Sequence, residues 1–326
     1  MPGPLDRSTT WPYEDGEPGV FVYSRYGGPT LADAEAALGE LDGGEAVLFA
    51  SGAAASAAVV LALLEPGQTV ALAEGAYFGT GVLFDELARW GLRHVEFDQT
   101  GPPPAEVDLV WLEAPSNPFL TMPDFEAAAA HPAPVLCDST AATPLNVRPL
   151  ERGCELALHS ATKYLAGHDD ALVGAVVCRD PSTAARLREF RTRTGPVPGA
   201  DTAWLLLRGL QTLEVRLARQ TESAKVLVER LRSHEAVATV RYPGLSALLS
   251  FDVADADAAR RVETALSVIT NATSLGGVVS RIEARARWEG ERVPPGLLRL
   301  SVGLEDVEAL WADLEQALDR LTSGTP

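Results

Sequence analysis

Lysine is nearly absent from this chain, although basic residues are not. Of the 27 lysines and arginines, only Lys163 and Lys225 are lysines, which indicates a sequence that uses arginine wherever a plain positive charge suffices. Lys225 lies in the polar–apolar helical run ESAKVLVERL and is expected on a solvated helix face. Lys163 instead follows the apolar run 155–158, in the order His-Ser-Ala-Thr-Lys-Tyr. Arginine keeps its proton in proteins, whereas a lysine whose pKa is lowered can condense with an aldehyde.

Acidic residues outnumber basic ones, 45 to 27, and cysteine is scarce. The formal net charge is −18, so a polyanionic duplex or an acidic membrane surface would be repelled, and neither is an expected partner. No apolar run reaches the roughly 20 residues of a membrane span, and no charged-then-apolar export signal is present.

The five histidines lack zinc-ligand spacing, so no metal is expected. Cys137, Cys154 and Cys178 lie in or beside apolar runs without a Cys-x-x-Cys pair, which predicts a reduced, cytoplasmic protein.

The composition is that of a globular protein, with 46% hydrophobic and 22% charged residues over 326 positions. We expect an N-terminal arm over 1–45, a large domain over 46–200, and a linking helix with a small C-terminal domain over 201–326. In the large domain apolar segments alternate with helical patterns, which predicts an α/β fold with a largely parallel sheet. Its expected strands are 70–73, 94–97, 108–112, 134–137, 156–159 and 173–178, with helices beginning near 52, 80 and 124.

The arm and the small domain have simpler patterns. The arm is rich in proline, glycine and aromatics, with one short helix expected over 31–41. One helical stretch, 202–234, is expected to lead into the small domain. The strands expected there are 237–242, 247–252 and 298–302, with helices over 256–266 and 307–321.

Three further positions could belong to a cofactor-binding site, although each also has a purely structural interpretation. Ser51-Gly52 begins a helix of small residues, whose free N–H groups could bind a phosphate, although many helices begin in this way. Tyr77 opens the next helix and could stack on a flat cofactor or simply pack. Asp138 ends an apolar strand, where it could pair with a pyridinium nitrogen or cap the next turn. Their order before Lys163 is typical of a pyridoxal 5'-phosphate (PLP) site.

At this point the sequence resembles the Cys/Met-metabolism PLP-dependent enzymes, which include cystathionine γ-synthases, cystathionine γ-lyases and methionine γ-lyases. The resemblance implies an α/β PLP-dependent transferase fold of type I, with a large, mostly parallel sheet domain and a smaller C-terminal α/β domain. The matching stretches keep the family's order over nearly the whole chain, and they are 23–30, 51–52, 77–80, 111–118, 138–140, 144–145, 159–169, 204–213, 242–245, 274–277 and 299–306.

The resemblance also implies a role for each site residue. Lys163 would bind PLP as a Schiff base and then act as the base that moves the Cα proton, and Tyr77 would stack on the ring and take part in proton transfer. The expected cofactor contacts are Tyr23, Arg25, Gly52, Ala53, Tyr77, Asp138, Thr140, Ser160, Thr162 and Lys163. The expected substrate contacts are Asn117, Ser274 and Arg299.

Subunits would share these sites. In the family, the tyrosine and arginine that match Tyr23 and Arg25 reach the phosphate of a neighbouring subunit. The resemblance therefore implies a homodimer with shared active sites, and a tetramer as the usual next step.

The chain differs from the family in three places. Its arm is shorter, the segment after Leu245 lacks a helix-sized insertion, and Arg287-Trp288 replaces a Thr-His pair. The positions that hold a second amino-acid head group in cystathionine-cleaving relatives are Val22, Val82 and Thr273 here, and all three are uncharged. We therefore expect a carbon–sulfur lyase whose substrate has one amino-acid head and a small or apolar leaving group. A γ-replacement enzyme and a catalytically decayed PLP-binding protein remain alternatives, and the sequence does not separate β- from γ-elimination.

Overall fold

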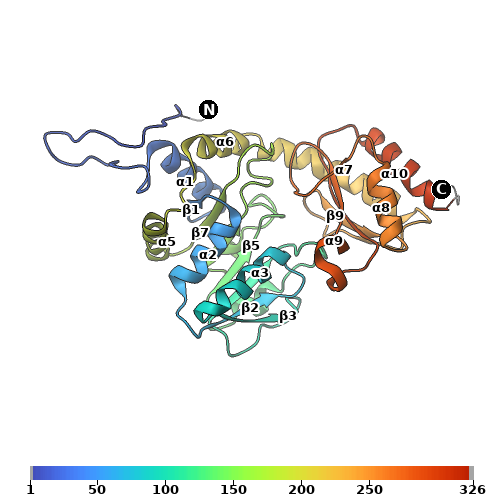
Figure 1. Cartoon of the computed structure of the whole chain (residues 1–326), viewed down its shortest axis with the longest axis horizontal. Coiled ribbons are helices and arrows are strands. Elements are labelled where there is room, and N and C mark those ends of the chain that lie inside the picture. Colours follow the sequence, from blue (N-terminus) through green and yellow to red (C-terminus); the bar gives the residue numbers. More distant parts are fainter. Residues whose placement is uncertain (1–2, 323–326) are drawn as a thin grey trace.

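The computed structural model describes residues 3–322 and contains two β-sheets, each covered by helices (Figure 1). The larger sheet has seven strands in the order β1-β7-β6-β5-β4-β2-β3. Strands β2 to β6 run parallel to one another, whereas β7 is antiparallel to both β1 and β6. The strands are β1 (Glu45–Phe49), β2 (Thr69–Ala73), β3 (Arg93–Phe97), β4 (Leu109–Glu113), β5 (Val135–Asp138), β6 (Leu156–His159) and β7 (Gly174–Cys178).

Helices cover both faces of this sheet, which explains why its central strands are continuous apolar runs. One face packs mainly against α2 and α5, and the other packs against α1 and α6. The helices are α1 (Pro29–Asp42), α2 (Gly52–Leu63), α3 (Phe78–Leu87), α4 (Phe125–Ala129), α5 (Pro181–Thr194) and α6 (Ala200–Leu210), with short 3₁₀ turns at Ala88–Trp90 and Pro149–Arg152.

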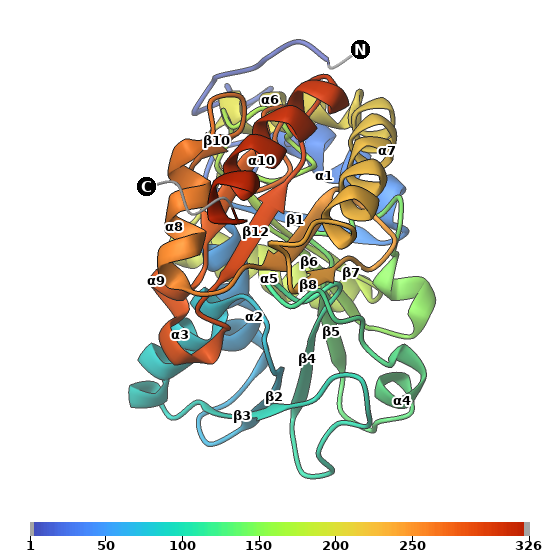
Figure 2. The ribbon, with the colours of Figure 1, turned by 90° about the vertical axis from the view of Figure 1, so that its right-hand side faces the viewer.

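The smaller sheet lies beyond the long helix α7 (Leu213–Arg232), and Figure 2 shows it facing the viewer together with α8 and α10. Its five strands follow the order β10-β11-β12-β9-β8. They are β8 (Thr239–Arg241), β9 (Leu248–Asp252), β10 (Thr270–Asn271), β11 (Arg281–Ala284) and β12 (Leu297–Ser301). The remaining helices are α8 (Ala256–Ala265), α9 (Ala286–Glu289) with a 3₁₀ turn at Gly290–Arg292, and α10 (Val307–Thr322).

The expected α/β fold with a largely parallel sheet is confirmed, whereas several details of the prediction are wrong. The helical stretch expected over 202–234 is two helices, α6 and α7. Just before the break Gly209 packs against backbone, where a Cβ would lie 2.4 Å from the Ala166 carbonyl oxygen. The buried Arg216 guanidinium also donates to the Gly209 carbonyl (2.8 Å). Strand β1 and helix α5 were not expected, and neither was β11, whose sequence RIEA carries two charges.

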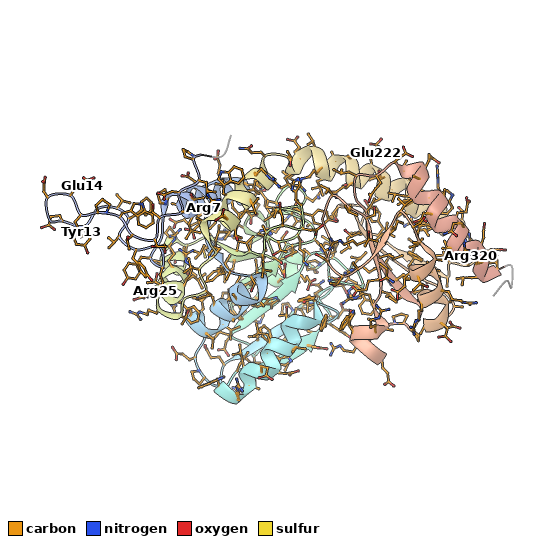
Figure 3. The ribbon with its side chains drawn as sticks, turned by 45° about the horizontal axis from the view of Figure 1, so that its top comes forward. Arg7, Tyr13, Glu14, Arg25, Glu222 and Arg320 are labelled. Carbon is orange, nitrogen blue, oxygen red and sulfur yellow. The ribbon has the colours of Figure 1, made fainter. Side chains whose placement is uncertain are left out.

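The N-terminal arm extends away from both sheets, with Tyr13 and Glu14 at its tip (Figure 3). Its backbone pairs only locally among the described residues, at Thr10 with Tyr23 and at Glu14 with Glu17. The division of the chain at 45/46 and 200/201 stays a prediction. Over residues 3–322, no helix combines the length and the apolar character that crossing a membrane requires.

Candidate active site

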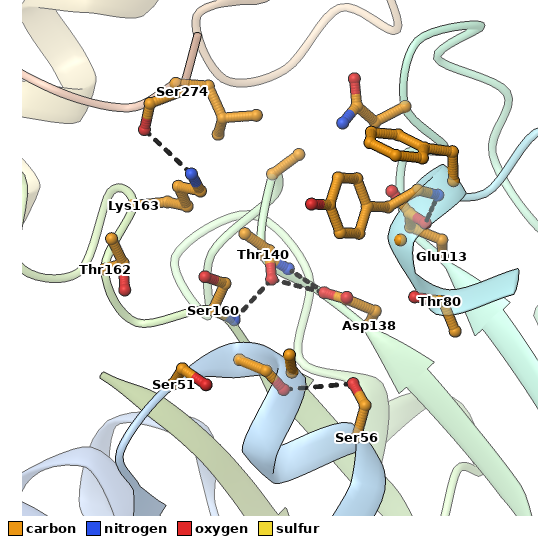
Figure 4. A pocket seen from close by; sticks show the side chains of 18 of the residues that line it. Ser51, Ser56, Thr80, Glu113, Asp138, Thr140, Ser160, Thr162, Lys163 and Ser274 are labelled. Carbon is orange, nitrogen blue, oxygen red and sulfur yellow. Dashed lines mark hydrogen bonds between the residues drawn. The ribbon is translucent and has the colours of Figure 1, made fainter. Parts of the chain in front are cut away.

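A cavity of about 430 Å³ lies where the carboxyl ends of β4, β5 and β6 meet the start of α2 (Figure 4). This edge is where ligands bind in parallel α/β sheets. Residues of the smaller sheet close the cavity from the opposite side, so that both sheets contribute to one site. Eleven of the thirteen site residues expected from the sequence line it: Gly52, Ala53, Tyr77, Asn117, Asp138, Thr140, Ser160, Thr162, Lys163, Ser274 and Arg299.

The start of α2 forms one end of the cavity. Ser51 caps the helix, because its Oγ accepts from the Ala54 amide (3.1 Å) and its carbonyl accepts from the Ala55 amide (3.0 Å). The N–H groups of Gly52 and Ala53 have no acceptor within the helix, so they are available to an anion. A Cβ on Gly52 would lie 2.9 Å from the Ser160 Cβ. Glycine is therefore required if the Ser160 hydroxyl is to sit beside these amides.

Thr162 lines the same cavity, but its hydroxyl already has partners. It donates to the Val173 carbonyl (3.1 Å) and accepts from the Val173 amide (2.9 Å). In this arrangement the hydroxyl fixes the loop that carries Lys163 to the segment leading into β7. Thr162 could donate to an anion only after breaking its bond to Val173.

Asp138 is buried at the end of β5, with one carboxylate oxygen fixed and the other available. Thr140 donates to Oδ1 twice, from its amide (2.9 Å) and its hydroxyl (2.5 Å). The Thr140 hydroxyl in turn accepts from the Ser160 amide (2.8 Å). Burial raises the pKa of Asp138, and the two bonds from Thr140 oppose that rise. Within residues 3–322, Oδ2 accepts no hydrogen bond, so a cationic N–H group placed there would favour the ionised carboxylate.

Lys163 lies opposite, where its amine donates to Ser274 Oγ over 2.9 Å. Burial first and the nearby Arg299 guanidinium second lower the pKa of Lys163 from 10.5 to about 8. An appreciable fraction of the amine is therefore unprotonated near neutral pH, which is the form that attacks a carbonyl carbon. Ser274 has a φ of 90°, a strained value for a residue other than glycine.

Tyr77 precedes α3, and its ring lies at the cavity mouth with 45% of the residue exposed. Its amide donates to Glu113 Oε2 (2.6 Å), which fixes the start of the helix. Its ring contacts Phe78 edge-on, with 5.1 Å between ring centroids. A Cβ on Gly79 would lie 2.5 Å from Tyr77 Cε1, so any larger residue at that position would displace the ring.

Arg299 on β12 is buried at the side of the cavity formed by the smaller sheet. It donates to Asn117 Oδ1, the Ser274 carbonyl and Glu283 Oε2, each over 3.1 Å. Burial lowers the pKa of Arg299 to about 10, so the guanidinium stays charged at neutral pH. These contacts use three of its five N–H donors, and two remain for a carboxylate in the cavity.

Tyr23 and Arg25, the two remaining expected cofactor residues, do not line this cavity. Arg25 donates to the Thr192 carbonyl on α5 (2.7 Å), and its guanidinium lies over the rings of Tyr23 and Tyr26 at 5.4 and 5.1 Å. Figure 3 places Arg25 near the base of the projecting arm. A role in a phosphate site therefore requires the cavity of another subunit.

Several residues of the cavity wall were not among the expected site residues, and they include Glu113, Arg285 and Trp288. Burial and the neighbouring Asp138 raise the pKa of Glu113 well above its usual value. Arg285 is buried against Glu283 and Glu289, at 2.6 and 2.7 Å. For these residues the sequence offered one signal, the replacement of a family Thr-His pair by Arg287-Trp288. That replacement indicated a change in this part of the chain but did not show which residues its side chains contact.

Comparisons with known proteins identify the family of the chain. The family model for Cys/Met metabolism PLP-dependent enzymes matches residues 2–319. The L-methionine gamma-lyase of Streptomyces avermitilis is 41% identical, with 98% of this chain and 85% of that protein aligned. The cystathionine gamma-synthase of Mycobacterium tuberculosis is 36% identical, with 97% and 91% aligned. A solved cystathionine gamma-lyase of Micromonospora echinospora superposes with a TM-score of 0.91 at 37% identity, over 97% and 93% of the two chains. The chain therefore belongs to the Cys/Met-metabolism PLP-dependent enzyme family.

Proposed function

We propose that this enzyme is a PLP-dependent carbon–sulfur lyase whose substrate carries one amino-acid head group and a small or apolar leaving group. The observation that carries the proposal is that the amine of Lys163, the carboxylate of Asp138 and the guanidinium of Arg299 face one cavity. The lyases named among its relatives support the same reaction class. Members of this family depend on PLP.

The residues present fit this cofactor. The start of α2 offers the free amides of Gly52 and Ala53 beside the Ser160 hydroxyl, and the contact that excludes a Cβ at Gly52 keeps this cradle open. We assign the phosphate to these three residues, with Thr162 holding the loop beside them. Asp138, aided by Thr140, is assigned to the pyridinium nitrogen, because its Oδ2 is left available.

The chain's own groups would then carry out the proton transfers. PLP, when bound, supplies a ring that draws electrons from the substrate Cα. Lys163 would hold the cofactor through its amine, and once freed by the substrate the same amine would take the Cα proton. The hydrogen bond to Ser274 orients the amine for that step. Tyr77 lies over the mouth of the cavity, where we assign it to cover the cofactor ring and to assist proton transfer.

We assign the substrate α-carboxylate to Arg299, whose position is fixed by Asn117 on one side and Ser274 on the other. A guanidinium with fixed neighbours binds a carboxylate with little loss of side-chain freedom. Farther out, Thr273 lines the cavity and Val82 is exposed nearby, so neither offers charge to a second amino-acid head group.

We propose a homodimer as the smallest active assembly, with Tyr23 and Arg25 of one subunit completing the phosphate site of the other, and a tetramer as the next step. The support is that the arm projects from its own body (Figure 1) and that neither residue lines the cavity of its own chain. A cytoplasmic location is proposed as well, since Cys137, Cys154 and Cys178 are buried free thiols.

A panel of amino acids tests the function. The PLP-loaded enzyme is incubated with L-cysteine, S-alkyl cysteines, L-methionine, O-acetyl-L-homoserine and L-cystathionine, while 2-oxo acid, ammonia and thiol are measured. We expect equal amounts of oxo acid and thiol from the sulfur substrates, with cystathionine poorer in kcat/KM than the best of them. A clear preference for cystathionine contradicts the proposal that the leaving group is small or apolar. Thioether formation from O-acetyl-homoserine and a thiol, without oxo acid, would indicate a γ-replacement enzyme.

A further inference from the structure

Trp288 forms part of the cavity wall in a fixed orientation. It lies on the short helix α9, and although 56% of the residue is exposed, it lines the cavity. Its Nε1 donates to Glu283 Oε1 over 2.6 Å. The other oxygen of that buried carboxylate accepts from Arg299 (3.1 Å) and Arg285 (2.6 Å). The indole ring is thus held by the same carboxylate that positions the arginine assigned to the substrate.

The charged groups of this wall neutralise one another. Arg285 is only 2% exposed and forms ion pairs with Glu283 and Glu289. Its Nη2 lies 2.7 Å from Glu289 Oε1 but has no well-directed hydrogen bond in the described part of the chain. Arg299 shares Glu283, so two guanidinium groups face two carboxylates. Beyond the α-carboxylate assigned to Arg299, a second charged group entering here would meet paired charges and would have to separate them.

The surfaces left open on this wall are apolar. The Arg285 guanidinium lies 5.8 Å over the Phe78 ring, which also lines the cavity. Leu172, which is 65% exposed, and Leu275, which is buried beside Ser274, also line the cavity. An alkyl or aryl group that reaches the indole face gains contact without breaking any ion pair, and the burial of each methylene group is favourable.

We propose that Trp288 determines specificity by contacting the leaving group, and that the preferred substrates are cysteine S-conjugates whose sulfur carries an uncharged alkyl or aryl group. This inference rests on the lyase function proposed above and names its substrate class. In the step, Lys163 removes the Cα proton, the Cβ–S bond breaks with its electron pair going to sulfur, and sulfur takes up a proton. Overall, the conjugate and one water molecule yield a thiol, pyruvate and ammonium, with no external oxidant or reductant.

Two conjugates of matched shape test the proposal. S-isobutyl-L-cysteine and S-carboxymethyl-L-cysteine differ chiefly in having two methyl groups or two charged oxygens at the same place. With the PLP-loaded enzyme, kcat/KM for pyruvate release is measured for both, together with the Kd of each from the change in absorbance of bound PLP. We expect wild type to favour the isobutyl conjugate. Trp288→Ala should lower its kcat/KM about 5- to 20-fold, with little change for the carboxymethyl conjugate.

Control variants separate contact from structure. Trp90→Ala removes another exposed tryptophan, one outside the cavity lining, and should leave both values unchanged. Trp288→Phe keeps an aromatic ring but loses the bond to Glu283, and should retain most of the preference. Equal losses for both conjugates in Trp288→Ala would overturn the proposal, because the indole would then act only on the fold.

Two further outcomes are decisive. A preference for the carboxymethyl conjugate that Arg285→Met abolishes would show an anion site in this wall and would also overturn the proposal. If neither conjugate is cleaved, the lyase function fails, and the ratio of the two Kd values in wild type and Trp288→Ala still decides whether the indole selects apolar substituents.

Discussion

The amine of Lys163 and the hydroxyl of Ser274 are joined by a 2.9 Å hydrogen bond that connects the two halves of the molecule (Figure 4). Lys163 follows a strand of the larger sheet, whereas Ser274 lies in a loop of the smaller one. Arg299 donates to the carbonyl of the same serine. The proposed base and the proposed carboxylate-binding group are therefore tied to one strained residue, so a shift of that loop alters both.

The reactivity of Lys163 should show its lowered pKa. Because burial and Arg299 lower that pKa from 10.5 to about 8, the amine loses its proton at a lower pH than an exposed lysine does. We expect the rate of reductive methylation of Lys163 in the PLP-free protein to rise with pH and to be half-maximal near the lowered value. Mass spectrometry of the peptide that contains Lys163 measures this rate. A midpoint close to the ordinary lysine value would contradict the environment described here.

Gly52→Ala should weaken PLP binding while the fold is retained. The added Cβ would lie 2.9 Å from the Ser160 Cβ, so the serine or the helix start must move out of the phosphate cradle. Such overpacking costs about 1–3 kcal/mol, or roughly 5- to 150-fold in Kd. Equilibrium titration of the PLP-free protein with PLP measures the change. Gly199→Ala, at a position with open space around the new Cβ, is the matched control, and equal affinities in both variants would argue against the cradle.

Glu113→Gln should become relatively more stable than wild type as pH rises. Burial and Asp138 raise the pKa of Glu113 in the folded state, so the folded protein binds a proton more tightly than the unfolded chain does. The wild-type protein therefore loses stability as pH rises from the pKa of Glu113 in the unfolded chain to its higher pKa in the folded protein. The glutamine variant has no such group to titrate. Thermal unfolding of both proteins between about pH 5 and pH 8 measures the difference in Tm. A difference that stays constant over this range would refute the buried-carboxyl account.

Mixed dimers test the proposed sharing of sites. An Arg25→Ala subunit lacks its arm contact, and a Lys163→Ala subunit lacks its catalytic amine, so each homodimer should be inactive or nearly so. In a mixed dimer one site combines an intact Lys163 with an intact Arg25 from the partner. We expect activity to return towards half that of wild type in purified mixed dimers carrying two different affinity tags. No recovery would show that the arm serves its own subunit.

The strands of the larger sheet could be predicted because they are buried on both faces and therefore form continuous apolar runs. Strand β11 could not, since Glu283 faces Arg299 on the adjoining strand and its charge is satisfied only in the folded protein. At the break between α6 and α7, Gly209 contacts Ala166 and its carbonyl accepts from Arg216, and the contact with Ala166 joins residues that are far apart in the sequence.

The same distinction applies to the site. Lys163, Asp138 and Gly52 were predictable because each stands at a strand end or a helix start, where local pattern determines position. The roles of Glu113 and Arg285 depend on neighbours from distant segments, Asp138 for one and Glu289 for the other. A sequence pattern shows that such charges exist but not which partners they have.

The behaviour of Lys163→Ala decides whether this cavity is the active site. Purified wild type and variant are loaded with PLP, and the visible absorbance of the bound cofactor and the release of 2-oxo acid from an S-alkyl cysteine are recorded together. We expect the variant to lose the absorbance band that depends on the bond between PLP and lysine. We also expect it to release oxo acid no faster than free PLP does. Continued turnover by the variant with that band intact would contradict the assignment of Lys163 and of this cavity as the active site.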